Sequence, residues 1–237
     1  AQHLDWESLE LGKQLGVGGY GTVNKAMYKG LPVAVKQLRD LTSDASGSLS
    51  MFLQECWAMT FLQHDRIIEM IGVCYKPMAM ILEFCELGDL RSFLDKYHNM
   101  EIIVGVRILL DVAHAMEYAH HRLWPSMIHK DLKSPNVLIT EKNGVIEAKV
   151  ADLGLAEVFS KRGKIASVDN PFWAAPEILQ AGLCSKKVDV WSFGIMMWEC
   201  LFPTEFPYKR ELDELKWMSV LSNNICSLGL RPYTPLD

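Results

Sequence analysis

The stretch at residues 129–136, His-Lys-Asp-Leu-Lys-Ser-Pro-Asn, constrains the fold and chemistry of this chain more than any other feature. It sets a carboxylate (Asp131), an ammonium group (Lys133) and an amide (Asn136) at fixed offsets, and a second carboxylate follows at Asp152. Any one of these residues alone could belong to a turn or a cap, but turns and caps do not require the whole set at these offsets. Carboxylate and amide oxygens suit Mg²⁺, which completes its shell with phosphates and water.

Two further motifs lie upstream, a glycine loop and then a lysine. Gly16, Gly18 and Gly21 match GxGxxG, a weak signal alone because dinucleotide-binding folds and ordinary turns also use it. In dinucleotide-binding folds a helix follows the glycines, whereas residues 22–26, Thr-Val-Asn-Lys-Ala, are typical of a strand. A glycine hairpin lets backbone N–H groups approach phosphates because no Cβ intrudes. With Lys36 in Val-Ala-Val-Lys, the order of the motifs is the one that ATP-dependent phosphoryl transfer requires.

Local patterns predict strands in the N-terminal part. Residues 9–16, 21–28 and 31–38 are short, glycine-punctuated segments with β-branched residues. An exposed loop is expected at residues 40–50, which are rich in Ser, Asp and Gly. Two more strands are expected within residues 73–84 and would close a small sheet.

Helices are predicted before and after a break at Gly88. Residues 50–63 read as a helix with one inward face, and a carboxylate on that face needs a cationic partner because burial of an unpaired charge is costly. That face comprises Phe52, Glu55, Met59 and Leu62. A long helix ending near His121 is expected to bury one apolar face, and residues 188–201, apolar almost all round, predict a helix inside a lobe. The long helix is expected to bury Ile102, Val106, Leu109, Ala113 and Met116.

The ordered motifs resemble those of a protein kinase domain, and the resemblance covers almost the whole chain. Residues 175–177, Ala-Pro-Glu, match the motif that closes the family's activation segment, and residues 189–194, Asp-Val-Trp-Ser-Phe-Gly, match the start of its large buried helix. The form of residues 129–136, together with Trp173 before Ala-Ala-Pro-Glu, resembles the tyrosine-kinase-like group. Mixed-lineage, Raf and Roco-type kinases are not distinguished by these motifs.

The resemblance implies an α+β, bilobal fold. It divides the chain into a β-rich N-lobe at residues 1–82, a hinge at residues 83–87 and an α-rich C-lobe at residues 88–237, with an ATP cleft between the lobes. The family usually continues through two more helices, so the C-lobe is expected to be incomplete at its C-terminus.

The resemblance also assigns roles to the polar residues. Lys36 would contact the α- and β-phosphates and pair with Glu55. Asp131 would act as the base and Lys133 would offset charge on the transferring phosphoryl group. The metal ligands would be Asn136 and Asp152. Asp189 would hold the backbone of residues 129–136, although it could equally be a helix N-cap.

Nucleotide contacts are expected from both lobes. Leu82 would control access behind the adenine, backbone groups of Glu83 and Cys85 would bind its edge, and Asp89 would reach the ribose. Val23, Ala34 and Leu138 would enclose its faces. The full expected set is Leu15, Gly16, Gly18, Gly21, Val23, Ala34, Lys36, Leu82, Glu83, Cys85, Asp89, Leu138 and Asp152.

Three departures from the family pattern carry expectations. Lys130 stands where regulated kinases have Arg, and an ammonium cannot make the bidentate phosphate contact of a guanidinium, so we expect weaker dependence on activation-segment phosphorylation. Leu153 replaces the usual Phe as an apolar plug, and Asn170 replaces a Thr that contacts the base in many Ser/Thr kinases. Ser160 and Ser167 are candidate phosphorylation switches, or ordinary loop serines.

The expected function is transfer of phosphate from Mg-ATP to protein serine or threonine, because Lys133 follows the base by two residues. The alternatives are a nucleotide-binding pseudokinase scaffold and a dual-specificity or tyrosine kinase.

The net charge of −5 predicts no nucleic-acid partner and no direct membrane contact, and no apolar run approaches the ~18 residues of a membrane span. Six cysteines without CxxC spacing indicate reduced thiols, hence a cytoplasmic domain. An ATP-competitive inhibitor could share the cleft, and a dimer could form through a larger parent protein.

Overall fold

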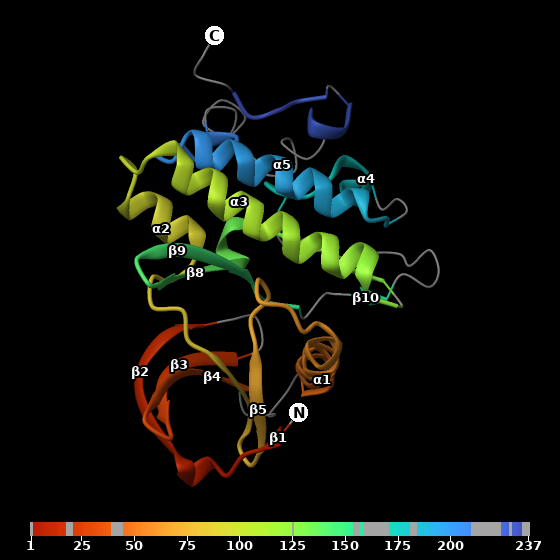
Figure 1. Ribbon diagram of the computed structural model, residues 1–237. Coiled ribbons are helices and arrows are strands. Elements are labelled where there is room, and N and C mark those ends of the chain that lie inside the picture. Colours follow the sequence, from red (N-terminus) through yellow and green to blue (C-terminus); the bar gives the residue numbers. More distant parts are fainter. Residues whose placement is uncertain are drawn as a thin grey trace.

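The computed structural model describes residues 2–17, 21–38, 45–124, 126–153, 157–158, 171–180, 184–209, 224–227 and 229–233. Within these residues the chain forms an N-terminal sheet and a mainly helical C-terminal part, which lie at opposite ends of the molecule in Figure 1. The expected α+β architecture, with a β-rich N-lobe and an α-rich C-lobe, is therefore confirmed. None of the helices in the described ranges is long and apolar enough to span a membrane.

The N-lobe contains a six-stranded sheet in the order β1-β5-β6-β4-β3-β2. All neighbouring strands are antiparallel except β1, which pairs in parallel with β5. The strands are β1 (Gln2–His3), β2 (Leu9–Val17), β3 (Gly21–Tyr28), β4 (Leu31–Leu38), β5 (Met70–Tyr75) and β6 (Met78–Glu83). The predicted strands at 9–16, 21–28 and 31–38 match the structure closely, whereas β1 was not expected. A short 3₁₀ helix, η1 (Trp6–Ser8), follows β1.

Helix α1 (Ala45–Phe61) packs against β4 and β5. It begins five residues earlier than predicted, so the expected loop at 40–50 is wrong for residues 45–50, and residues 39–44 lie outside the described part. The predicted inward face is confirmed. Phe52, Glu55, Met59 and Leu62 are each no more than 5% exposed.

The C-lobe is built around α3 (Ile102–Glu117) and α5 (Lys187–Leu201), which pack together. Shorter helical segments are α2 (Leu90–Lys96), the π-helical turn η2 (Tyr118–Arg122), the 3₁₀ turn η3 (Ser134–Asn136) and α4 (Pro176–Leu179). The hairpin of β8 (Val137–Lys142) and β9 (Val145–Val150) lies between the N-terminal sheet and α3 (Figure 1). A further two-stranded sheet joins β7 (Met127–Ile128) to β10 (Glu157–Val158). The prediction of a mainly helical region after Gly88 missed both pairs of strands.

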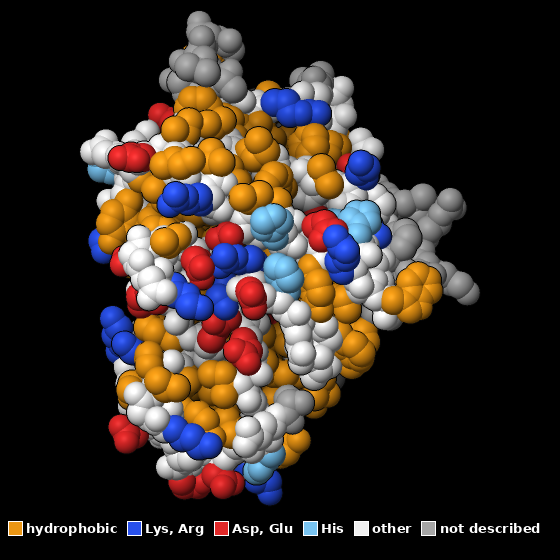
Figure 2. All heavy atoms as spheres, in the orientation of Figure 1, with side chains coloured by type: hydrophobic (Ala, Val, Ile, Leu, Met, Phe, Trp, Pro, Cys, Tyr) orange, Lys and Arg blue, Asp and Glu red, His pale blue; other side chains and the backbone are white. Residues whose placement is uncertain are grey.

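The predicted buried face of α3 is wrong for Ile102 and Val106 and confirmed for Met116, whereas Leu109 and Ala113 are half-buried. Ile102 is 68% exposed and Val106 is 50% exposed, whereas the buried residues are Gly105, Ile108, Asp111, Val112, Ala115 and Met116. The helix is apolar on both sides, so periodicity alone does not select the buried one. The buried side is the one that packs against β9 and α5. Hydrophobic side chains therefore cover much of the upper part of the face in Figure 2.

Candidate active site

The first part of the site is an ion cluster around Lys36, in which Lys36 and Glu55 are buried and the Asp152 side chain is 44% exposed. Strand β4 carries Lys36 and α1 presents Glu55, so the Lys36 Nζ lies 2.8 and 2.7 Å from the two carboxylate oxygens of Glu55. The same Nζ lies 3.2 Å from Oδ1 of Asp152, which follows β9. Lys36 is 9% exposed and Glu55 is 1% exposed. The cationic partner that Glu55 was predicted to need is Lys36.

Burial and charge act in opposite directions on this cluster. Burial lowers the pKa of Lys36, and the Asp152 carboxylate opposes that effect. Burial and then the Asp152 carboxylate raise the pKa of Glu55 well above its usual value. Burial acts to raise the pKa of Asp152, but the Lys36 ammonium, together with His129 and Lys133, more than offsets burial, so the pKa of Asp152 falls below its usual value. These cations, Lys36 first among them, favour the ionised form of Asp152, which is the form of a carboxyl group that can bind a metal.

The second part of the site is the catalytic loop, residues 129–136. Oδ2 of Asp131 accepts hydrogen bonds from Lys133 Nζ at 2.7 Å and from the Asn136 amide nitrogen at 3.0 Å. The Asn136 amide nitrogen also donates to the Asp131 carbonyl oxygen at 2.8 Å. Because the amide nitrogen makes both bonds to Asp131, the amide oxygen of Asn136 is the atom that can bind a metal. The donor set, the Asn136 oxygen and the Asp152 carboxylate, suits Mg²⁺.

The loop is held by a buried carboxylate from α5. Asp189 is 2% exposed, and it accepts backbone N–H bonds from His129 and Lys130, both at 2.9 Å. Its Oδ2 also lies 2.7 Å from Nε2 of His120 in η2. The predicted contact of Asp189 with the loop backbone is confirmed, and it is not the N-cap of α5, which is Lys186. Lys130 and Asp152 have left-handed backbone angles, φ 70° and 59°, uncommon for residues with side chains and frequent at functional sites.

Sequence reasoning did not find His120 because nothing in its local pattern distinguishes it from other histidines. It also did not find Glu199, a fully buried carboxylate of α5 that contacts the catalytic loop. A signal for Glu199 existed. It is a single acid in an apolar helix, the same pattern that pointed to Glu55.

The expected phosphate-loop glycines occupy different environments. A Cβ on Gly16 would meet no atom of the described residues within 4 Å, so packing against them does not require a glycine at this position. A Cβ on Gly21 would lie 2.2 Å from the Gln37 carbonyl oxygen, so Gly21 is needed for the close approach of β3 to β4. Gly18 lies outside the described residues. Val23 and Ala34 are half-buried on β3 and β4, and Leu15 on β2 is 43% exposed.

The expected hinge follows β6, which pairs with β4 so that Leu82 lies opposite Ala34. Leu82 and Cys85 are buried, at 9% and 8% exposed. Asp89 forms an isolated bridge with Leu138 of β8, which brings these two predicted contacts together. The carboxylate of Asp89 accepts bonds from the backbone N–H and hydroxyl of Ser92, so in this structure it caps α2.

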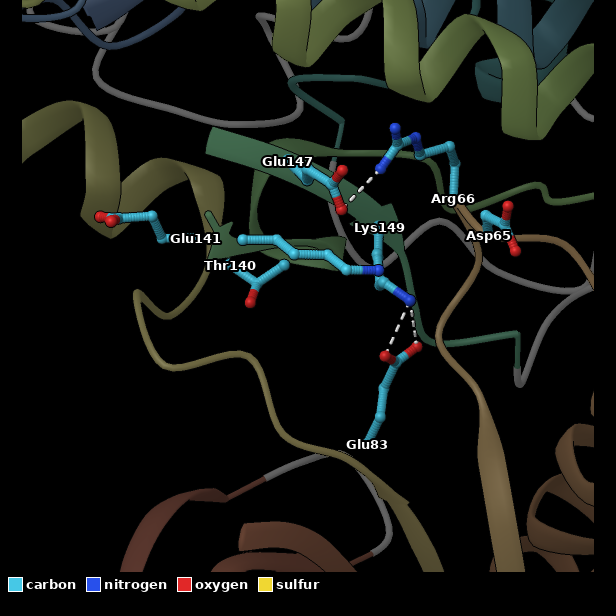
Figure 3. A pocket seen from close by; sticks show the side chains of 8 residues that line it. Asp65, Arg66, Glu83, Thr140, Glu141, Glu147 and Lys149 are labelled. Carbon is cyan, nitrogen blue, oxygen red and sulfur yellow. Dashed lines mark hydrogen bonds and ion pairs between the residues drawn. The ribbon is translucent and has the colours of Figure 1, made fainter. Parts of the chain in front are cut away.

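The side chain of Glu83 belongs to a separate, polar pocket of about 320 Å³ (Figure 3). Lys149 of β9 points at the Glu83 carboxylate across 2.7 Å, and Arg66 binds Glu147 at 2.8 Å. Charged side chains also gather at mid-height on this face in Figure 2. Among the predicted nucleotide contacts, only Glu83 lines this pocket, so it is distinct from the predicted adenine position.

The departures from the family pattern are partly described. Leu153 is 3% exposed and lines a small apolar space with Leu62 and His129, which fits its predicted role as a plug. The pKa of Lys130 is lowered by burial. Ser160, Ser167 and Asn170 lie outside the described residues.

An ammonium that joins two carboxylates beside a loop that presents a carboxylate, a lysine and an amide defines a phosphotransferase site in a bilobal fold. Residues 9–227 match the family described as "Protein tyrosine and serine/threonine kinase". The chain belongs to this protein kinase family, and the predicted resemblance is confirmed.

Similar proteins include two from Dictyostelium discoideum and one from Homo sapiens. "Probable serine/threonine-protein kinase roco8" is 36% identical over 82% of this chain and 11% of that protein. "Probable serine/threonine-protein kinase pats1" is 31% identical over 99% of this chain and 8% of that protein. The human "Mitogen-activated protein kinase kinase kinase 10" is 36% identical over 90% of this chain and 23% of that protein. The chain thus spans less than a quarter of the length of these relatives, which agree with the predicted tyrosine-kinase-like group.

Proposed function

We propose that this chain is the catalytic domain of a protein kinase that transfers the γ-phosphoryl group of Mg-ATP to a protein serine or threonine. One observation carries the proposal, the convergence of Lys36, Glu55 and Asp152 from separate elements into one ion cluster, in which Lys36 and Glu55 are buried. Burial of the Lys36 ammonium costs desolvation free energy that a surface lysine would not lose. Its position between two carboxylates therefore indicates a functional role.

Each residue has a defined role in the proposed reaction. Lys36 binds the α- and β-phosphates and is held in place by Glu55. Asp131 accepts the proton of the attacking hydroxyl, and Lys133 offsets negative charge on the transferring group. Asn136 and Asp152 hold Mg²⁺ through their oxygens. The bound Mg-ATP supplies the phosphoryl group and neutralises part of its charge.

The acceptor is proposed to be serine or threonine. Lys133 lies two residues after the base, and two of the relatives above are named probable serine/threonine-protein kinases, the third a mitogen-activated protein kinase kinase kinase. The Ala-Pro-Glu segment and the helix α5 favour a protein substrate over a small molecule. Nucleotide contacts are assigned to Leu15, Gly16, Gly18, Gly21, Val23, Ala34, Leu82, Glu83, Cys85, Asp89 and Leu138.

The cellular context follows from the same proposal. All six cysteines are unpaired thiols, which supports a cytoplasmic location for an ATP-dependent enzyme. An ATP-competitive inhibitor would bind where the adenine binds. Dimer formation is proposed only through a larger parent protein.

The test measures phosphate transfer from Mg-ATP to generic serine/threonine and tyrosine substrates. Asp131→Asn should abolish transfer, because the amide cannot accept the proton of the hydroxyl. Asp5→Asn is the matched control, since Asp5 is exposed and its side chain makes no cap bond. Phosphate on tyrosine alone would contradict the acceptor assignment. Nucleotide binding without transfer would favour the pseudokinase scaffold.

A further inference from the structure

Glu199 of α5 is a fully buried carboxylate, 0% exposed, that receives hydrogen bonds from three separate segments. Its Oε1 accepts from the Ser134 hydroxyl at 2.7 Å and from Arg91 of α2 at 3.2 Å. Its Oε2 accepts from the indole N–H of Trp173 at 2.8 Å. The carboxylate thus connects α5 with α2, the catalytic loop and the segment that contains Trp173.

A carboxylate in this position depends on every donor that it has. Burial raises the pKa of Glu199, and the bonds from Ser134, Trp173 and Arg91 oppose that effect. Removal of one donor leaves a buried acceptor less well satisfied, so the remaining groups must move or the carboxylate must take up a proton. A change at one donor therefore alters the hydrogen bonds that the other donors make to Glu199.

Two of the donors belong to functional segments. Ser134 is 0% exposed and lies in the catalytic loop between Lys133 and Asn136, both of which bind Asp131. Its hydroxyl is the side-chain link from this part of the loop to α5. A shift of Ser134 would displace its neighbours and so the carboxylate of Asp131.

Trp173 lies two residues before the Ala-Pro-Glu motif. We call residues 171–177 the substrate segment. Trp173 is 4% exposed, its carbonyl oxygen accepts from the Ser192 hydroxyl at 2.8 Å, and its ring meets Phe206 edge-on at 5.8 Å. Within the described part of the chain, the indole N–H donates to Glu199. The substrate segment is thus fixed to the same carboxylate as the catalytic loop.

We propose that Glu199 is a positioning residue that couples the substrate segment to the catalytic loop through Trp173 and Ser134. Docking of a protein substrate on residues 171–177 is thereby linked to the placement of Asp131. This inference rests on the proposed kinase function and extends it to a route between substrate binding and the base.

The experiment compares two tryptophan-to-phenylalanine variants. Trp173→Phe keeps a buried ring and removes the bond to Glu199. Trp191→Phe is the matched control. Trp191 lies in α5, and its buried indole N–H has no hydrogen-bond partner among the described residues. Hydrogen–deuterium exchange of residues 129–136 is measured for both, with kcat and the KM values for ATP and for peptide.

Trp173→Phe should accelerate exchange in residues 129–136 and lower kcat about fivefold or more, with the KM for ATP within about twofold of the parent value. Trp191→Phe should leave both exchange and kcat within about twofold. Because coupling is reciprocal, Ser134→Ala should accelerate exchange in residues 171–177. This second variant carries the test if Trp173→Phe does not fold.

Equal effects of the two tryptophan variants would overturn the proposal, as would unchanged exchange in residues 171–177 of Ser134→Ala. In Trp173→Phe, a rise in the KM for ATP as large as the fall in kcat would indicate that the whole active site has lost order. That result would also contradict the proposal. If the parent protein transfers no phosphate, the proposed function fails, but the exchange measurements still decide whether Glu199 couples the two segments.

Discussion

Replacement of Asp189 by Asn tests whether one buried carboxylate holds the catalytic loop. Asp189 accepts three hydrogen bonds, from the backbone N–H groups of His129 and Lys130 and from His120. Asparagine has the same shape, but one oxygen becomes an NH₂ group. Whichever way the amide turns, that NH₂ faces at least one backbone N–H, and the remaining bonds lose their charge.

The magnitude follows from these contacts. Loss of a hydrogen bond to a charged acceptor costs about 1.5–3 kcal/mol, and an unsatisfied buried donor adds to this, so Asp189→Asn should lower the free energy of unfolding by about 3 kcal/mol. For a chain of this length each kcal/mol corresponds to about 2–4 °C, hence a fall in Tm of about 6–12 °C. Scanning calorimetry measures the Tm, and the transfer assay measures the loss of kcat expected from a displaced loop.

The matched control is Glu117→Gln, which breaks an exposed ion pair with Arg122. Exposed pairs contribute about 0–1 kcal/mol, so the Tm should change by no more than about 4 °C. A Tm of Asp189→Asn within that same range would refute the reasoning, because it would mean that the three bonds do not hold the loop.

Three further predictions concern the core and the ion cluster. Gly72→Ala should detach β1, because the new Cβ would lie 2.6 Å from a backbone oxygen of that strand. The apolar burial lost with β1 should lower the free energy of unfolding, measured in urea, by about 2 kcal/mol. An unchanged unfolding transition would contradict this. Burial raises the pKa of both Cys85 and Cys200 to about 12, so only about one thiol in 10⁴ is ionised at pH 8, and alkylation followed by mass spectrometry should be far slower in the folded than in the unfolded protein. The pKa of Asp152 is lowered on folding, so its stabilisation is present above its ordinary pKa of 3.8 and is lost as pH falls through the lower folded value. In Lys36→Met that acid-dependent loss should become smaller, because Lys36 is the main group that lowers the pKa of Asp152. An unchanged pH profile of unfolding would show that Lys36 does not hold the carboxylate.

Local sequence predicted the N-terminal strands well because alternation and glycine punctuation are local signals. It predicted the inward face of α1 because the residues of that face recur at helical spacing, and the carboxylate among them indicated a cationic partner. It failed for the orientation of α3, which is apolar on both sides, because only packing against β9 and α5 selects the buried one. It also missed β1, β7 and β10, since a two-residue strand exists only by pairing with a distant one.

The sequence by itself determined the chemistry, because Lys36, Asp131 and Asp152 lie in short motifs whose spacing is characteristic of phosphoryl transfer. Only the tertiary structure decided how these groups are held. The bonds of Glu199 to Ser134 and to Arg91 join residues 65 and 108 positions apart, and no local pattern encodes such distances. The physical reason is that a buried carboxylate is stable only where folding brings its donors together, and that condition can be met from any part of the chain.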